Sequence, residues 1–384
     1  LTFLKGINMK KILIFYGAYG GGHLSAARAI KNYLDTNYPE CETLMVDCVE
    51  YINKYLNKVS TAAYKEMAKK APWMWKKVYN NSEHGALARI STTSNKLMSR
   101  KLNRILQEFE PDLVISTHPF SNQMCTNLKK HKKIKCKIAT VLTDMAPHSQ
   151  WTIDSEYIDY FFVSNKEMKE ILSDNGIADF KVFVTGIPLS ERFKYKFDKD
   201  SIYNDFNLDK DKTTVLFFAG GEFGLGRKRT SLVFRALIRL CKNYQIIAIS
   251  GRNKKMYSKF RKLVQAYDVS DRVKVLDFTD KVPELMSISS FVITKPGGLT
   301  TTESLVSGDP LILINPIPGQ EESNADFLVR HGVAIWIKKD DNIARIIKNI
   351  YRHPEHLDDM KSKISDLARP NSTKNICDIL MDTI

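Results

Sequence analysis

Residues 11–23, KILIFYGAYGGGH, join a short apolar run directly to a glycine-rich turn and a histidine. The same order recurs in residues 214–224, TVLFFAGGEFG, and in residues 291–303, FVITKPGGLTTTE. A run of β-branched and aromatic residues predicts a buried strand, and glycines directly after it predict a turn. Each of the three stretches is therefore expected to form a strand, a tight turn and the start of a helix.

Other short apolar runs alternate with longer amphipathic stretches along the chain, and the alternation restarts after Gly186-Ile187-Pro188. Apolar strands that alternate with helices predict parallel sheets covered on both faces. We therefore expect an α/β protein with two doubly wound, Rossmann-like domains, in which ligands bind beyond the carboxyl ends of the strands. The remaining predicted strands are Leu113–Ser116, Ile138–Leu142, Tyr160–Val163, Gln245–Ile249, Val273–Leu276 and Pro310–Ile314.

The expected domains are residues 1–190 and 191–355, followed by a helical tail at residues 356–384. A charged linker is predicted at residues 188–212. Its strings Asp198/Asp200 and Asp209/Asp211 are flanked by lysines, and we interpret them as solvated rather than metal-binding.

Composition excludes several classes of protein. The 384 residues include 58 Lys and Arg against 43 Asp and Glu, a net charge of +15, and no uncharged apolar stretch of about 18 residues predicts a membrane-spanning helix. The first residues do not have the layout of a signal peptide. Six scattered cysteines form no CxxC pair and no zinc spacing, so neither a disulfide framework nor a metal is expected, and a reducing cytoplasm fits.

Positive charge is concentrated between Lys54 and Arg104, where twelve Lys and Arg stand against two acids. Tryptophans lie in the same stretch. Three interpretations remain open from charge alone: a solvated helical face, an anionic membrane surface, or nucleic acid. The residues of this candidate surface are Lys69, Lys70, Trp73, Met74, Trp75, Lys76 and Lys77.

The glycine turn before His23 has neither the spacing of a dinucleotide fingerprint nor the Gly-Lys-Ser/Thr of a P-loop. His23 would stand in the first turn of a helix, where it could take a proton at neutral pH. A capping or purely structural histidine is the alternative interpretation. The turn at Gly220, Gly221 and Phe223 is a plausible diphosphate cradle, although Arg227 replaces the lysine of a P-loop.

The third motif continues into residues 316–324, PIPGQEESN. Glu303 could accept hydrogen bonds from vicinal hydroxyls, and Gln320, Glu321 and Asn324 offer mixed donors and acceptors. This set suits a polyhydroxylated ligand. The alternative is that the glycines and acids only serve turns and helix N-termini.

Together these motifs resemble a known family. The chain combines GxYGxGH, Thr143-Asp144-Met145 with Trp151 downstream, Thr185-Gly186-Ile187-Pro188, and KPGGLTTTES followed by PIPGQEESNADF. It is similar in these residues to the processive diacylglycerol glycosyltransferases of glycosyltransferase family 28, which include bacterial diglucosyldiacylglycerol synthases and plant monogalactosyldiacylglycerol synthases. The resemblance covers almost the whole chain.

The resemblance implies a GT-B fold, two Rossmann-like domains around a central cleft, with the C-terminal helix returning to the first domain. It implies inverting transfer of a hexose, glucose as first choice, from a UDP-sugar to diacylglycerol without a metal or other cofactor. His23 would be the general base, assisted by Asp144. Glu303 would bind the ribose hydroxyls. The donor site would also include Gly22, Gly186, Gly220, Gly221, Phe223, Gly251, Arg252, Asn253, Phe278, Pro296, Gly297, Gly298, Gln320, Glu321 and Asn324.

A lipid acceptor also favours the membrane interpretation of residues 54–104, with His148 and Trp151 as further acceptor-side candidates. The protein would then be peripheral, on the cytoplasmic face of the cell membrane, with no nucleic acid partner. Three rival functions remain: the transferase that completes lipid II from UDP-N-acetylglucosamine, a UDP-N-acetylglucosamine 2-epimerase, and a basic nucleic-acid-binding protein.

Overall fold

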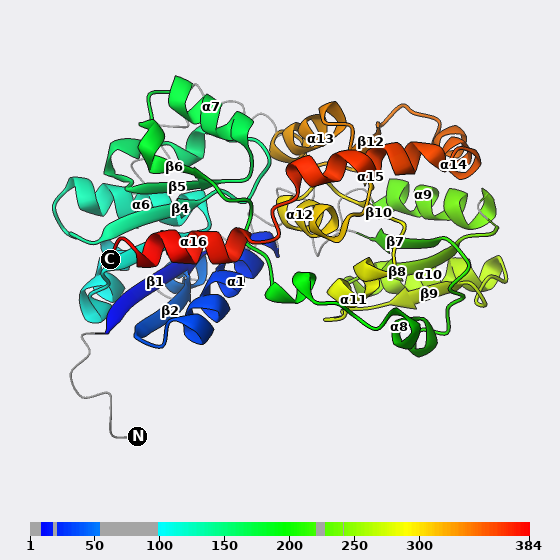
Figure 1. The fold of residues 1–384 in the computed structure, drawn as a ribbon, viewed down its shortest axis with the longest axis horizontal. Helices are drawn as coiled ribbons and strands as arrows, with labels where there is room; N and C mark the ends of the chain where they lie inside the picture. The colour runs from blue at the N-terminus through cyan, green and yellow to red at the C-terminus, as the bar shows by residue number, and fades with distance from the viewer. Residues whose placement is uncertain (1–8, 18–20, 54–98, 220–226, 241) are drawn as a thin grey trace, which may run out of the picture. The chain divides into compact units, whose positions relative to one another are not determined.

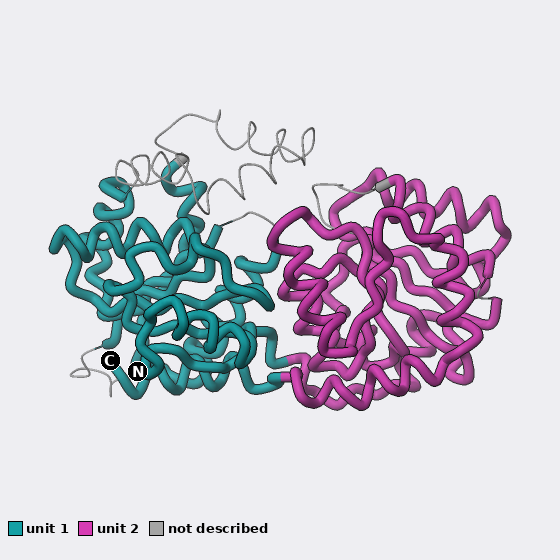
Figure 2. Tube along the Cα trace, turned by 90° about the horizontal axis from the view of Figure 1, so that it is seen from above, with its two compact units in different colours: residues 1–191, 369–384 teal, residues 192–368 magenta. Residues whose placement is uncertain are grey.

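The computed structural model describes residues 9–17, 21–53, 99–219, 227–240 and 242–384. The chain divides into two compact units, Leu1–Glu191 with Arg369–Ile384, and Arg192–Ala368 (Figure 2). Each unit contains one six-stranded parallel sheet with alternating helices, as predicted.

The first unit is built on β1 (Lys10–Tyr16), β2 (Cys41–Asp47), β3 (Leu113–Ser116), β4 (Lys137–Val141), β5 (Tyr160–Val163) and β6 (Val182–Val184). The strand order is β2-β1-β3-β4-β5-β6, and β1 pairs with β3 in the register Ile12 to Leu113. Its helices include α1 (Gly22–Asn37), α2 (Cys48–Asn53), α6 (Pro119–Lys130), α7 (Lys166–Asp174) and α16 (Ser372–Met381), shown in Figure 1.

Both faces of this sheet are buried, which explains why β1 is apolar from Ile12 to Phe15. Ile12 and Ile14 join a core with α1 and α16, whereas Leu13 and Phe15 join a second core with α2 and α6. Since successive side chains of a strand point to opposite faces, a strand covered on both sides has no polar alternation.

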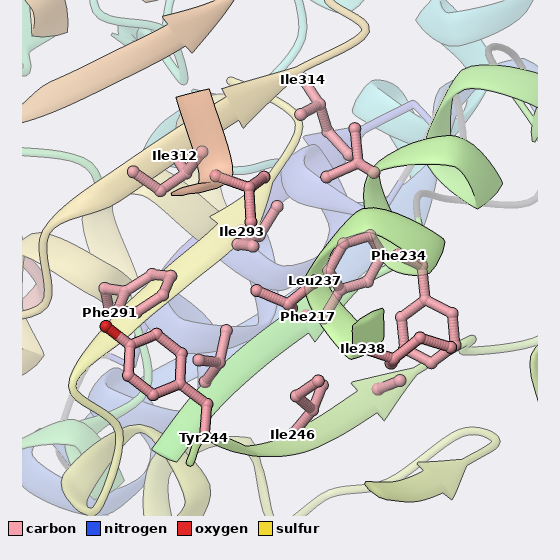
Figure 3. Close-up of a cluster of buried hydrophobic side chains, with 14 of the residues drawn as sticks. Phe217, Phe234, Leu237, Ile238, Tyr244, Ile246, Phe291, Ile293, Ile312 and Ile314 are labelled. Carbon is pink, nitrogen blue, oxygen red and sulfur yellow. The ribbon is translucent and has the colours of Figure 1, made fainter. Parts of the chain in front are cut away.

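The second unit is built on β7 (Thr214–Phe218), β8 (Gln245–Ile249), β9 (Val273–Leu276), β10 (Phe291–Thr294), β11 (Leu311–Ile314) and β12 (Ala334–Ile337), in the order β12-β11-β10-β7-β8-β9. Its core centres on aromatic rings, among which Phe234 and Phe260 stack at 4.2 Å and Phe217 meets Phe234 at 5.4 Å (Figure 3). The helices are α8 (Lys199–Asp205), α9 (Arg227–Leu240), α10 (Lys254–Ala266), α11 (Val282–Ser287), α12 (Gly298–Ser307), α13 (Gln320–Arg330), α14 (Ile343–Arg352) and α15 (Glu355–Leu367).

Three strands, β2, β6 and β12, were not expected from the sequence, and all three lie at an edge of their sheet. An edge strand pairs on one side only, so it can be short or partly polar, but β12 is the apolar run AIWI and was missed although its pattern is that of a strand. β6 has only three residues, and β2 carries Glu42 and Asp47. The nine central and edge strands that were predicted are all present.

In each sheet the chain changes direction once. In unit 1 it runs from β1 outward to β2, then returns to β3 on the other side of β1. In unit 2 it runs from β7 outward to β8 and β9, then returns to β10. Ligands of open α/β sheets bind beyond the carboxyl ends of the strands at such switch points. The strands β1, β7 and β10, which glycine-rich segments follow in the sequence, therefore end at the two positions that favour binding.

The C-terminal tail divides between the units instead of returning as one helix from residue 356. α15 buries Leu357 and Met360 in the core of unit 2, whereas α16 buries Ile376 in the core of unit 1. Pro370 separates the two helices because the residue before a proline avoids helical geometry. Only residues 369–384 therefore return to the first unit.

The two aspartate strings near the linker serve local structure. Asp198 caps α8 by accepting from the backbone N–H groups of Asp200 and Ser201 at 3.1 and 3.4 Å. Asp209 accepts from the N–H of Asp211 at 3.0 Å. Both strings thus cap turns, which agrees with a solvated rather than metal-binding role.

Candidate functional site

The candidate site of unit 1 begins at the N-terminus of α1, directly after the glycine turn. Gly22 is the first residue of α1 and His23 the second, and Gly21 at the N-cap offers no side-chain cap. The first N–H groups of the helix are therefore available to a ligand. Residues 18–20 of the turn lie outside the described residues.

The His23 imidazole is held by two threonines from other strands. Its Nδ1 lies 2.6 Å from the carbonyl oxygen of Thr117 and 2.9 Å from Oγ1 of Thr143. Because a carbonyl oxygen can only accept, Nδ1 must carry the proton and donate it. The basic lone pair is therefore on Nε2, which has no hydrogen-bond partner among the described residues.

Thr117 also fixes the backbone around His23. Its hydroxyl lies 3.0 Å from the carbonyl oxygen of His23 and 3.3 Å from that of Phe15, and its N–H donates to Phe15 at 3.0 Å. One residue at the end of β3 thus joins the end of β1 to the first turn of α1. The contact occurs at the switch point, where β1 and β3 are neighbours.

Burial lowers the pKa of His23 from 6.5 to about 4, and the hydrogen bond with the Thr117 carbonyl partly opposes this shift. Burial disfavours the charged imidazolium. His23 is therefore neutral at pH 7, the form that a general base requires before it takes a proton.

Two further histidines surround His23, and the sequence prediction missed the first of them as a site residue. The ring of His118 meets that of His23 edge to face, at 4.6 Å and 79°. Burial and the neighbouring histidines lower the pKa of His118 well below its usual range, and burial lowers that of His148 to about 3. His118 follows the strand β3 at a strand-to-helix turn, the signal by which it could have been found.

The other acceptor-side candidates have different positions. Asp144 is buried in the turn after β4, where its carbonyl oxygen accepts from Ser164 Oγ at 2.8 Å. The prediction that its carboxylate assists His23 stays a prediction. Trp151 was predicted to lie on the acceptor side. It is fully buried in the core of unit 1, so its side chain is not available to a membrane surface. Lys69, Lys70, Trp73, Met74, Trp75, Lys76 and Lys77 lie outside the described residues.

The candidate site of unit 2 lies where β10 leads into α12. Gly297 is the N-cap of α12 without a side-chain cap, so its first N–H groups can face an anion. Glu303 lies in the same helix and makes no hydrogen bond or ion pair with any described residue. Burial raises its pKa from 4.5 to about 8. A partly buried acid without a counter-charge suits hydroxyl groups that donate to it.

The first residues of α13 approach the segment that joins β10 to α12. Asn324 is fully buried and its Nδ2 donates to the carbonyl oxygen of Pro296 at 3.1 Å. Glu321 accepts from the N–H of Ile317 at 2.6 Å, and a Cβ on Gly297 would lie 3.9 Å from its Oε1. The structure therefore brings Pro296, Gly297, Glu321 and Asn324 together, as the donor-site prediction requires, with Gln320 as the first residue of α13.

A third group lies at the carboxyl ends of β8 and β9. The Arg252 guanidinium stands 5.2 Å from the centre of the Phe278 ring, and that ring is 62% exposed. Asn253 caps α10 by accepting from the N–H of Met256 at 3.2 Å, and Gly251 has a φ of +54°. An exposed aromatic beside a cation can stack on a base. Arg252 and Phe278 are therefore placed to stack on a base, whereas Asn253 caps α10.

The glycines predicted in the donor site differ in what the structure explains. Gly186 has a φ of +90°, and a Cβ there would lie 2.5 Å from Cβ of Arg369, so the returning tail alone requires glycine. Its donor-binding role stays a prediction. Gly220, Gly221 and Phe223 lie outside the described residues. Among those described, no group of three His, Cys, Asp or Glu side chains is arranged to hold a metal ion.

Comparisons with known proteins cover both units. The family model described as monogalactosyldiacylglycerol (MGDG) synthase matches residues 23–189, and the one described as glycosyl transferases group 1 matches residues 198–366. A processive diacylglycerol beta-glucosyltransferase of Bacillus licheniformis is 28% identical over 375 residues, 96% of this chain and 93% of that protein. The protein of that name from Bacillus thuringiensis is 28% identical over 393 residues, 98% of this chain and 94% of that protein.

Solved structures share the fold at lower identity. The UDP complex of S. aureus MnaA is 16% identical with a TM-score of 0.64 and covers 98% of both chains. MurG of Acinetobacter baumannii is 13% identical with a TM-score of 0.65, over 98% of this chain and 100% of that one. The two sheets and these likenesses define a two-domain α/β protein with the GT-B fold.

The sequence comparisons place the chain more narrowly within that fold. Residues 23–189 match the MGDG synthase family model, and the chain is similar over almost its full length to the processive diacylglycerol beta-glucosyltransferases.

Proposed function

We propose that this protein is an inverting glycosyltransferase that transfers a hexose, glucose as first choice, from a UDP-sugar to the hydroxyl of diacylglycerol. The observation that carries the proposal is the neutral His23, whose free Nε2 stands at the carboxyl end of β1 in a chain that resembles this family. Relatives named as processive further support repeated transfer onto the glycolipid product.

On the acceptor side, His23 Nε2 takes the proton of the acceptor hydroxyl as its oxygen attacks the anomeric carbon. The bond between that carbon and the diphosphate oxygen breaks, and UDP leaves with the electron pair. Attack from the face opposite the leaving group inverts the anomeric centre. The hydrogen bond from Nδ1 to Thr117 stabilises the imidazolium that forms.

On the donor side, Glu303 accepts from the ribose hydroxyls and the N-terminus of α12 faces the diphosphate. Gln320, Glu321 and Asn324 bind or position the sugar, and Arg252 with Phe278 lies at the uracil. Backbone N–H groups at a helix N-terminus stabilise the negative charge that develops on the leaving group.

The rival functions have weaker support. Likeness to solved structures, among them a UDP-GlcNAc 2-epimerase of Neisseria meningitidis at 15% identity and a TM-score of 0.64, and MurG at 13% identity, concerns the fold alone. In contrast, the relatives that are 28% identical over almost the full chain are named processive diacylglycerol beta-glucosyltransferases. A nucleic-acid-binding protein has no use for the partly buried acid Glu303 or for the contact of Asn324 with Pro296.

A product assay tests this proposal. The purified protein is incubated with diacylglycerol in anionic vesicles and with UDP-glucose, UDP-galactose or UDP-N-acetylglucosamine, and lipids are resolved by chromatography and mass. We expect mono- and dihexosyl diacylglycerol from UDP-glucose. Conversion of the donor into another UDP-sugar without any glycolipid would instead favour an epimerase. If no donor gave a lipid product, diacylglycerol would be excluded as the acceptor.

We further propose that the protein works as a peripheral protein at an anionic membrane surface on the cytoplasmic side, with residues 54–104 as the main docking segment. No described helix is long and apolar enough to cross a bilayer. The described residues offer a second basic surface on and before α10, where no acid occurs between residues 252 and 267. Its exposed cations are Arg252, Lys254, Lys255, Lys259, Arg261 and Lys262.

Charge reversal distinguishes the two surfaces. One variant replaces Lys69, Lys70, Lys76 and Lys77 by Glu, and the matched control replaces Lys255, Lys259 and Lys262 by Glu. Since each basic residue near an anionic surface contributes about 1 kcal/mol, we expect the first variant to lose at least about tenfold in binding to anionic vesicles. Unchanged binding of the first variant with loss in the second would move the docking surface to α10.

A further inference from the structure

His118 is in contact with His23 but has no part in the proposed reaction. The two rings meet edge to face at 4.6 Å and 79°. Gly17 also lies against His118, because a Cβ there would lie 3.0 Å from Cγ of that ring. The His118 ring therefore contacts both Gly17 and the His23 ring.

The His118 ring is itself fixed by the helix that it begins. It is the N-cap of α6, and its Nδ1 accepts from the N–H of Phe120 at 3.1 Å. Its carbonyl oxygen accepts from Ser121 Oγ at 2.9 Å. With Nδ1 used as an acceptor, the neutral ring carries its proton on Nε2, and it cannot rotate about χ2 without losing the cap.

We propose that His118 is a positioning residue for His23, on which the rate of sugar transfer depends: its ring, anchored as the N-cap of α6, holds the imidazole of the base against the carbonyl of Thr117. This inference rests on the proposed function. Edge-to-face contact restricts the tilt of the His23 ring, and the Thr117 hydrogen bond restricts its rotation. Together they fix the direction of the Nε2 lone pair, as a general base requires.

His118 also covers one side of His23, so its removal would admit water. The titratable groups whose charges couple with His23 are His118 and His148, and Asp144 follows Thr143 in the turn after β4. Burial is the main cause of the low pKa of His23. Hydration should therefore raise that pKa from about 4 toward 6.5, and the acid limb of the pH–rate profile should move toward neutral pH by the same amount.

Two substitutions separate the ring from the cap. His118→Asn keeps a side chain that caps helices well but removes the ring, whereas His118→Phe keeps a ring but cannot accept from Phe120. We expect His118→Asn to lower kcat about 10- to 100-fold with little change in Tm and in KM for the UDP-sugar. We expect His118→Phe to lower Tm yet recover most of the lost kcat. The matched control is His131→Asn at the exposed C-cap of the same helix, with kcat unchanged.

The result that overturns the proposal is wild-type kcat and an unmoved acid limb in His118→Asn, because α6 capping would then be the only role of His118. The proposal would also be overturned if kcat followed Tm in both variants, so that the variant with the lower Tm also had the lower kcat. Wild-type protein in the same assay tests the proposed function separately. NMR titration of 13C-labelled histidines reports the pKa of His23 without any turnover, so the positioning role can be judged even if the acceptor proves to be another lipid.

Discussion

The two switch-point sites of this molecule are built alike but polarised in opposite ways. In unit 1 the turn after β1 leads to a base, His23, and in unit 2 the turn after β10 leads to an acid, Glu303. Burial shifts both toward the neutral form, with the pKa of His23 lowered to about 4 and that of Glu303 raised to about 8. The same desolvation thus keeps His23 in unit 1 neutral, ready to accept a proton, and keeps Glu303 in unit 2 uncharged, able to form hydrogen bonds with hydroxyl groups.

The largest effect is expected from removal of the base. His23→Ala should lower kcat about 1000-fold or more, because no other described group takes the place of Nε2, while UDP affinity changes less than about twofold. Turnover and UDP titration measure the two effects, with His131→Ala as the control. Near-wild-type turnover would move the base role to Asp144.

A smaller effect, confined to the other unit, is expected from Glu303→Gln. Gln keeps one carbonyl acceptor but places an NH2 donor where the second carboxyl oxygen was, so one hydrogen bond from the ribose hydroxyls is lost and UDP binding should weaken about tenfold. Calorimetric titration with UDP measures it, and Glu355→Gln, at the exposed start of α15, is the matched control. Equal UDP affinity in the wild type and in Glu303→Gln would remove Glu303 from the donor site.

The smallest expected effect is on the pH dependence of protein stability, to which Glu303 and His23 contribute in opposite directions. In the unfolded chain Glu303 ionises near pH 4.5 but in the folded chain near 8, so the wild type loses stability as the pH rises between these values. His23 protonates near 6.5 when unfolded and near 4 when folded, so the wild type loses stability as the pH falls through that range.

Tm measured from pH 4 to 8 tests these opposite slopes. Relative to wild type, Glu303→Gln should gain Tm as the pH rises from 4.5 to 8, and His23→Gln should gain Tm as the pH falls from 6.5 to 4. Differences that stay constant with pH would mean that neither group is desolvated as the structure indicates.

Much of the architecture followed from local patterns. Central strands such as β3 and β5 were predicted with their observed ends, since burial on both faces requires continuous apolar runs. The edge strand β2 was missed because a strand that pairs on one side only can carry acids such as Glu42 and Asp47, whereas β12 is the apolar run AIWI and was missed although its pattern is that of a strand. Trp151 was assigned to the acceptor surface, yet it is a core residue, because a tryptophan in a loop motif does not reveal its burial.

By itself the sequence determined the two strand-turn-helix series, the glycine turns and the family resemblance, since these depend on residues that are close along the chain. Only the tertiary structure decided what surrounds His23. Thr117 and Thr143 lie 94 and 120 residues from it in sequence, and they meet it because β1, β3 and β4 are successive strands of one sheet. The tautomer of His23, its low pKa and its contact with His118 all follow from that convergence, because each depends on burial and on partners that no local pattern specifies.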